Sequence, residues 1–147
     1  MELTGRTLVE GEAAGPVLAL ATPLSFWGGV DAATGLIIDR SHPARGAGLA
    51  GRILVLPRGR GSSSSSAVLA EALRRGTGPL GIVLAEPDPI IAVGAIVARR
   101  LYGTVCPVAV FDGPSVGALR TGDAVSLVAA EGAAWLEARP DPGSRVS

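Results

Sequence analysis

Five consecutive serines, Ser62–Ser66, follow an arginine-glycine turn in the middle of the chain. In that turn Arg58 and Arg60 alternate with Gly59 and Gly61. Glycines leave backbone N–H groups uncovered, and arginine side chains bind carboxylates or phosphates well. One serine would be enough to cap a helix, so a run of five exceeds that need. These residues predict an oxyanion-binding loop and do not by themselves name a reaction.

Two segments would hold this loop in place. Ile53–Leu56 is a short, entirely apolar run, which predicts a buried strand. From Ser66 to Arg75 the apolar residues fall on one helical face, and Gly76 provides a stop signal, so a helix is predicted there. The N–H groups of the turn and the positive end of the helix dipole would then face a bound anion.

The rest of the pattern predicts an α/β fold. After residue 53 the order is strand, helix, strand, helix, strand, which implies parallel pairing with right-handed crossovers. The expected architecture is a small parallel sheet with flanking helices, plus additional β-strands from both termini. Residues 1–139 would form one domain, and the Pro/Gly/Ser-rich residues 140–147 a flexible tail. The other predicted strands are Thr4–Val9, Val17–Ala21, Leu36–Ile38, Leu80–Leu84, Pro107–Phe111, Ala124–Ala129 and Ala133–Glu137; the second helix is Ile90–Leu101, and Gly11–Pro16 is a turn-rich connector.

The predicted topology brings two loops together. In parallel layers, ligands bind at the carboxyl edge of the sheet, where the loops after Leu56 and Leu84 would meet. The second of these loops contains Glu86 and Asp88. We therefore expect one or both of these acids beside the serine run.

Three further residues have two open interpretations each. Phe26 and Trp27 precede a glycine pair and would form either a plug over the core or a lid over a site. His42, the single histidine, precedes a proline and so adopts extended or turn geometry. A structural hydrogen-bonding role for His42 is favoured over a catalytic one.

Composition excludes several classes of protein. The chain has 147 residues, 48% of them hydrophobic and 18% charged, and its formal net charge is zero. All thirteen basic residues are arginine and they are spread along the sequence, which argues against a nucleic-acid partner. Cys106 has no second cysteine to pair with, so a buried core thiol is expected. No basic leader follows Met1 and no apolar run approaches the ~20 residues of a membrane span, so a cytoplasmic location is expected.

Common catalytic motifs do not fit the loop. Ser64 stands where a dinucleotide-binding loop needs its third glycine, and a P-loop needs a lysine that this chain lacks. The nucleophile elbow of a serine hydrolase is also absent. One cysteine and one histidine are too few for a metal site built from this chain alone, so no metal ligand is assigned.

Five segments follow one another in the order Pro23–Asp31, Asp39–Pro43, Leu54–Ser64, Glu86–Ile90 and Leu101–Gly103. Together they resemble the small, swivelling subunit of the aconitase X family. The resemblance runs from about Gly5 to Leu136 and implies a swivelling β/β/α fold. Family members pair with a larger subunit, or are fused to it, and this larger part carries an iron centre, either an iron-sulfur cluster or a mononuclear iron. For this chain the resemblance implies a heterodimer, in which the chain alone binds no iron and is inactive.

The resemblance also implies an activity and site residues. Family members are hydro-lyases: iron holds the leaving hydroxyl of a hydroxy acid while a serine base removes a proton beside a carboxylate. The matching serine is Ser62, the first after Gly61, and Arg60, Ser63 and Ser64 with Gly61 would contact the substrate. Aconitase proper has an arginine where Ser64 stands here. The basic partner would therefore be Arg60 or would come from the large subunit.

Two substrates divide the family. Bacterial members resemble a cis-3-hydroxy-L-proline dehydratase, and archaeal members a phosphomevalonate (mevalonate 5-phosphate) dehydratase. An Arg-only, Ala/Gly-rich and near-neutral composition favours a bacterial source and hence hydroxyproline. A non-catalytic anion-binding swivel domain is the other alternative. A phosphocarrier swivel domain would need a histidine in the serine loop, and His42 lies elsewhere.

Overall fold

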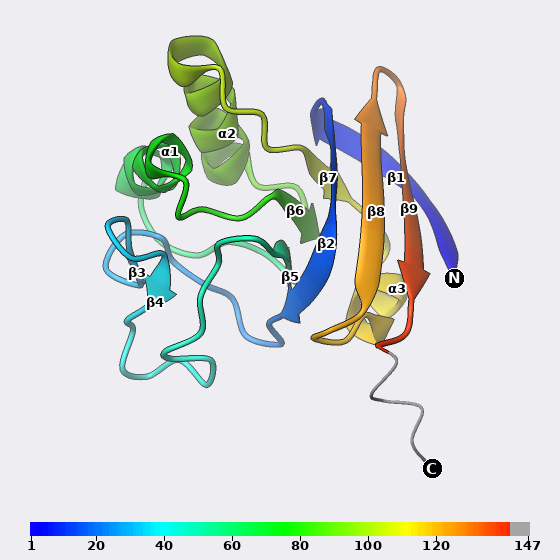
Figure 1. The fold of residues 1–147 in the computed structure, drawn as a ribbon, viewed down its shortest axis with the longest axis horizontal. Helices are drawn as coiled ribbons and strands as arrows, with labels where there is room; N and C mark the ends of the chain where they lie inside the picture. Colours follow the sequence, from blue (N-terminus) through cyan, green and yellow to red (C-terminus); the bar gives the residue numbers. More distant parts are fainter. Residues whose placement is uncertain (142–147) are drawn as a thin grey trace.

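The computed structural model describes residues 1–141, and its centre is a closed seven-stranded barrel in the order β1-β7-β6-β5-β2-β8-β9 (Figure 1). The barrel combines parallel and antiparallel strand pairing. Four neighbours are parallel: β2 (Gly11–Ala19), β5 (Ile53–Leu56), β6 (Gly81–Leu84) and β7 (Val108–Val110). Antiparallel pairing through β1 (Glu2–Val9), β8 (Ala124–Ala130) and β9 (Ala133–Arg139) closes the barrel.

Two helices cover one side of the barrel. α1 (Ser64–Arg75) follows β5, α2 (Pro89–Tyr102) follows β6, and the two helices pack against each other (Figure 1). The predicted α/β fold, with a parallel centre and strands added from both ends of the chain, is therefore confirmed. None of the helices within residues 1–141 is long and apolar enough to cross a membrane.

The core has two parts, and β5 contributes to both. Ile53 and Val55 lie among the side chains of the barrel interior. Leu54 and Leu56 pack with α1 and α2 on the outside of the barrel. Because both faces of the strand are covered, its sequence is a continuous apolar run rather than an alternating one. This strand ends directly before the serine loop and gives that loop a rigid base.

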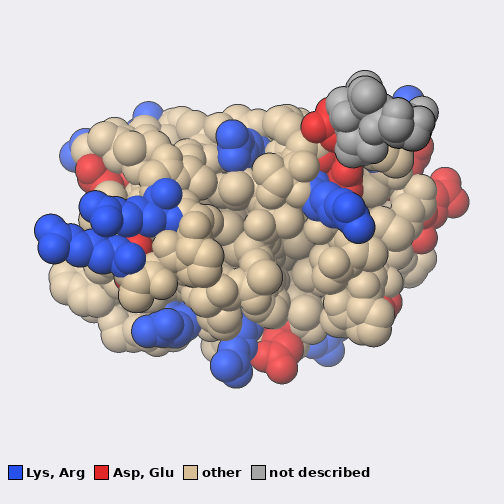
Figure 2. All heavy atoms as spheres, turned by 90° about the horizontal axis from the view of Figure 1, so that it is seen from below, with Lys and Arg blue, Asp and Glu red and all other residues tan. Residues whose placement is uncertain are grey.

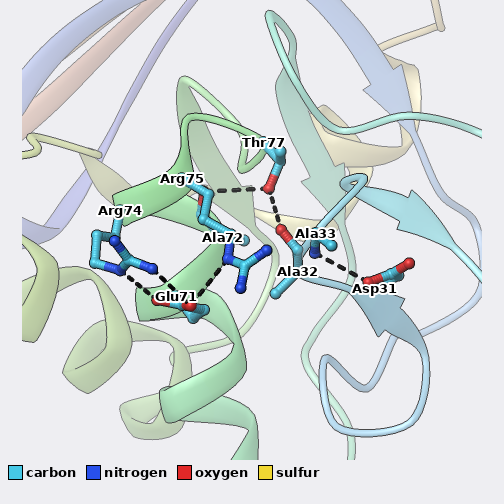
Figure 3. Close-up of polar contacts among 8 residues, drawn as sticks. All are labelled: Asp31, Ala32, Ala33, Glu71, Ala72, Arg74, Arg75 and Thr77. Carbon is cyan, nitrogen blue, oxygen red and sulfur yellow. Dashed lines mark hydrogen bonds and ion pairs between the residues drawn. The ribbon is translucent and has the colours of Figure 1, made fainter.

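A small hairpin of β3 (Val30–Asp31) and β4 (Leu36–Ile37) is anchored to the end of α1. Thr77 Oγ1 lies 2.6 Å from Ala32 O and 3.3 Å from Ala72 O, so one hydroxyl joins the hairpin to the helix (Figure 3). The hairpin is therefore tethered to the C-terminal end of α1.

The two arginines in the last turn of α1 are bound by an acid of the same helix. Glu71 accepts hydrogen bonds from Arg74 at 2.9 Å and from Arg75 at 2.9 Å (Figure 3). These bonds lower the pKa of Glu71 to about 2. Arg74 and Arg75 thus interact with Glu71, at the opposite end of α1 from the serine loop.

Three details differ from the sequence-based expectations. Gly11–Pro16 is not a turn-rich connector, because β2 begins at Gly11 and this half of the strand pairs with β8 from Gly11↔Ala129 to Pro16↔Ala124. The partner strand is more than a hundred residues away, so local turn signals gave the wrong assignment. A short helix, α3 (Gly113–Ala118), was not predicted, although Asp112 caps it by accepting from Ser115 N. Closure of the sheet into a barrel was not predicted either.

The other predicted elements are found within a few residues of their expected bounds. α1 starts at Ser64 rather than Ser66, and α2 extends one residue beyond the predicted helix at each end. Leu36–Ile38 is reduced to the two residues of β4. The predicted tail, 140–147, lies outside the described residues from position 142 onward.

Candidate functional site

The loop between β5 and α1 is held from two sides. Arg60 N donates to Leu24 O at 3.1 Å, and Leu24 and Gly59 form an isolated parallel bridge. On the other side, Pro57 O accepts from Ala85 N at 3.0 Å and from Glu86 N at 3.1 Å. The loops after β5 and β6 therefore meet at the carboxyl edge of the sheet, as predicted.

The five serines divide into two groups. Ser62, Ser63 and Ser64 are exposed, and their hydroxyls make no hydrogen bond within the described residues. Ser65 is buried and accepts from Trp27 N at 3.0 Å. Ser66 Oγ donates to Ile90 O at 2.7 Å and so joins α1 to α2. Only the first three hydroxyls are available to a ligand.

The start of α1 has free backbone donors. Ser63 occupies the N-cap position, but its side chain makes no capping bond. Within residues 1–141, the N–H groups of Gly61, Ser62 and Ser63 donate no hydrogen bond. Uncapped N–H groups at a helix N-terminus bind anions, because the helix dipole is positive there. This geometry suits an oxyanion and gives no support to a mere capping role for the exposed serines.

Asp88 is near the loop but serves α2. Its Oδ1 accepts from Ile90 N at 2.9 Å and from Ile91 N at 3.1 Å, which caps the helix. A Cβ placed on Gly59 would come within 2.2 Å of Asp88 Oδ2, so only glycine allows this approach. A cavity of about 110 Å³ lies between the loop and α2, lined in part by Gly59, Arg60 and Asp88. Glu86, by contrast, is exposed.

Arg58 and Arg60 are exposed, and within residues 1–141 neither forms an ion pair. Hydrogen bonds from the Ser41 hydroxyl and N–H keep the pKa of Asp39 below its usual value, and the nearby charge of Arg60 adds to this effect. Arginines are spread along the sequence, yet in space many gather over the half of the molecule that carries α1 and the β3–β4 hairpin (Figure 2). An anion that approaches the face drawn in Figure 2 meets several arginine side chains.

The structure shows different surroundings for Phe26, Trp27 and His42. Phe26 is 1% exposed and belongs to the core, whereas Trp27 is 60% exposed. His42 is buried; its Nδ1 accepts from Ala44 N at 3.0 Å, and its Nε2 lies 3.2 Å from Thr22 O. Because Nδ1 is the acceptor, Nε2 carries the proton and donates to Thr22 O. Both ring nitrogens thus stabilise a turn, which agrees with the structural role predicted for His42.

Cys106 is a buried core thiol, as predicted. Its side chain is fully buried, and burial raises the pKa of the thiol to about 12. Within residues 1–141 no group of three or more His, Cys, Asp or Glu side chains could hold a metal ion. The described residues therefore do not fit an iron site of their own.

The segment Leu24–Trp27 is the part of the site that sequence reasoning described least well. The notable contact is between Ser25 and Gly61: a Cβ on Gly61 would come within 2.3 Å of Ser25 Oγ. Ser25 lies 36 positions before Gly61 in the chain, so no local pattern reveals this contact. The only available signal was the serine between Leu24 and Phe26 in the segment that carries the family resemblance.

Replacement of Gly61 is expected to damage the loop. Gly61 has φ +106°, which L side chains rarely adopt, and a Cβ would also displace the Ser25 hydroxyl. We expect Gly61→Ala to lower the free energy of unfolding by about 1–3 kcal/mol. Gly46→Ala is the matched control, because Gly46 has φ +90° but no atom within 4 Å of the added Cβ. Denaturant unfolding of both variants measures the difference, and equal losses would show that the Ser25 contact contributes nothing.

Comparisons with known proteins give one consistent family. Residues 2–135 match the model of the aconitase X swivel domain. A cis-3-hydroxy-L-proline dehydratase from Pseudomonas aeruginosa is 52% identical over 104 residues, which cover 71% of this chain and 18% of that protein. A phosphomevalonate dehydratase small subunit from Thermococcus onnurineus is 37% identical over 93% of this chain and 99% of its own length.

A solved structure agrees in fold as well as in sequence. The crystal structure of Thermococcus kodakaraensis aconitase X in its holo-form matches with a TM-score of 0.83 and 37% identity, over 95% of this chain and 99% of that chain. The chain spans only 18% of the length of the P. aeruginosa dehydratase, but nearly the whole of the archaeal small subunit. With a family model that covers most of its length, this chain belongs to the aconitase X swivel-domain family.

Proposed function

We propose that the chain is the swivel-domain component of a hydro-lyase that dehydrates a small hydroxy acid. The main support is the exposed serine loop. Within residues 1–141, the Ser62 hydroxyl makes no hydrogen bond, and it lies next to backbone N–H groups of Gly61 and Ser63 that donate none. Ser62 would take the proton next to the substrate carboxylate. A serine alkoxide is a strong base that needs fixed donors, and backbone N–H groups at a helix N-terminus supply them without reorganisation.

The iron centre implied by the family would be held by a larger partner. The described residues offer no cluster of ligands: Cys106 is buried alone, and both nitrogens of His42 are engaged. This division of labour gives the swivel domain two tasks, to bind the substrate anion and to accept the proton. It also explains why the loop is open in this chain, since the partner would cover it and exclude water.

Arg60 is proposed to bind the substrate carboxylate, with Ser63 and Ser64 as further donors. Its guanidinium is exposed and lacks an ion pair within residues 1–141, while its backbone N–H is fixed on Leu24 O at 3.1 Å. Arg60→Ala is expected to raise KM more than it lowers kcat, because this contact already exists in the ground state. Steady-state kinetics of the assembled enzyme measure both constants. An unchanged KM would reassign the anion contact to Arg58 or to the partner.

The proposed substrate is cis-3-hydroxy-L-proline. Support comes from the 52% identity to the P. aeruginosa dehydratase, against 37% to the T. onnurineus small subunit. Phosphomevalonate is the second candidate, because the alignment with the archaeal subunit extends over 93% of this chain rather than 71%. The test is to offer each compound to the assembled enzyme and to compare kcat/KM. Selective dehydration of hydroxyproline is expected; preference for phosphomevalonate would select the alternative, and turnover of neither would reject both.

A further inference from the structure

A ring of three hydrogen bonds lies against the serine loop. Trp27 N donates to Ser65 Oγ at 3.0 Å, Ser25 Oγ donates to Trp27 O at 2.9 Å, and the two serine oxygens are 3.4 Å apart. A serine hydroxyl has one proton, and that of Ser25 is directed to Trp27 O, so Ser65 is the donor to Ser25. The two serine hydroxyls thus link the N–H of Trp27 to its own carbonyl oxygen, and hydrogen bonds connected in a chain strengthen one another.

The ring contacts the loop next to the proposed base. Gly61, directly before Ser62, packs so closely on the ring that a Cβ there would lie 2.3 Å from Ser25 Oγ and 3.7 Å from Ser65 Oγ. Ser65 also holds the loop through its backbone, because its N–H donates to Ser62 O at 3.0 Å. At 4% exposure Ser65 is one of two buried polar residues in the described chain. The ring therefore packs against the backbone directly before Ser62, and its member Ser65 is also bonded to the backbone of Ser62 itself.

We propose that Ser25 and Ser65 are positioning residues for the reaction, and that their ring holds Ser62 where it can receive the substrate proton. This inference rests on the proposed function of Ser62. The Ser62 side chain makes no hydrogen bond within residues 1–141, so only the backbone beneath it determines where its oxygen lies. Displacement of a reacting group by about 1 Å can cost about 100-fold in rate.

The test compares Ser25→Ala, Ser25→Thr and Ser66→Ala in the assembled dehydratase. Ser25→Ala breaks the ring, whereas Ser25→Thr keeps the hydroxyl. Ser66→Ala is the matched control, because it removes one hydrogen bond of 2.7 Å, to Ile90 O, that is not part of the ring. Ser25→Ala is expected to lower kcat by about 10- to 100-fold with less than about a twofold change in KM. Ser25→Thr should restore most of kcat, and Ser66→Ala should leave it unchanged.

A second readout follows the loop itself. Amide ¹⁵N relaxation of the chain should show that the order parameters of Gly61–Ser64 fall from about 0.85 toward 0.6 in Ser25→Ala but not in Ser66→Ala. If Ser25→Ala folds poorly, Ser65→Ala replaces it in both measurements, because it breaks the ring at another point. An unchanged kcat, or an unchanged loop, in the ring variants would overturn the inference. Ser62→Ala in the same assay separates the two proposals: normal turnover there rejects Ser62 as base even if the ring orders the loop.

Discussion

Ser62→Ala is expected to lower kcat of the assembled enzyme by roughly 10²–10⁴-fold, the usual contribution of a general base. Its thermal stability should hardly change, because the Ser62 side chain is exposed and makes no hydrogen bond within residues 1–141. If Ser62 were instead a helix cap, its loss would cost about 1 kcal/mol of stability and leave turnover near normal. The two roles thus predict opposite results for rate and stability.

The measurement pairs steady-state kinetics with thermal unfolding of the same preparation. Ser126→Ala is the control, since Ser126 is an exposed serine on β8, outside the loop. It should leave both the rate and the melting temperature unchanged. Normal turnover of Ser62→Ala would move the base elsewhere, and Ser63 would be the next residue to replace.

Leu54→Ala is expected to cause the largest loss of stability, about 2–5 kcal/mol of the free energy of unfolding. Leu54 is fully buried between the barrel and the helices, on the strand that leads into the serine loop. Truncation removes apolar contacts and leaves a cavity that the rigid barrel cannot close. The loss should appear as a lower denaturant midpoint with an unchanged m-value.

Leu101→Ala is the control for this change. Leu101 is 68% exposed at the end of α2, so the same truncation should cost no more than about 0.5 kcal/mol. Similar losses in the two variants would contradict the assignment of Leu54 to the core. A loss of activity in Leu54→Ala that is reversed by lower temperature would show that the strand acts on the site only through folding.

Sequence patterns correctly predicted the helices and strands that are determined by residues close to one another in the chain. The apolar run Ile53–Leu56 and the stop signal Gly76 both lie within a few residues of the structure they determine. The meeting of the loops after β5 and β6 also followed, because parallel topology fixes which strand ends share an edge. The loop that carries Ser62 was therefore predicted from sequence.

Features that depend on distant partners were not predicted. Gly11–Pro16 looks like a turn, but its hydrogen bonds are supplied by β8, from Pro16↔Ala124 to Gly11↔Ala129. Closure of the barrel depends on β1 pairing with both β7 and β9, which no local signal contains. The same limit applies to the site. The serine run looked uniform in sequence, and only tertiary contacts with Ser25 and Ile90 divide it into exposed and buried members.

The shared active site is tested most directly by reconstitution. The purified chain, a purified aconitase X large subunit and their mixture should be assayed for dehydration of cis-3-hydroxy-L-proline and of phosphomevalonate, with iron measured in each sample. Activity is expected only in the mixture, with the iron in the large subunit. Stoichiometric iron or turnover in the isolated chain, or full activity of the large subunit without it, would rule out the proposed division of roles between the two subunits.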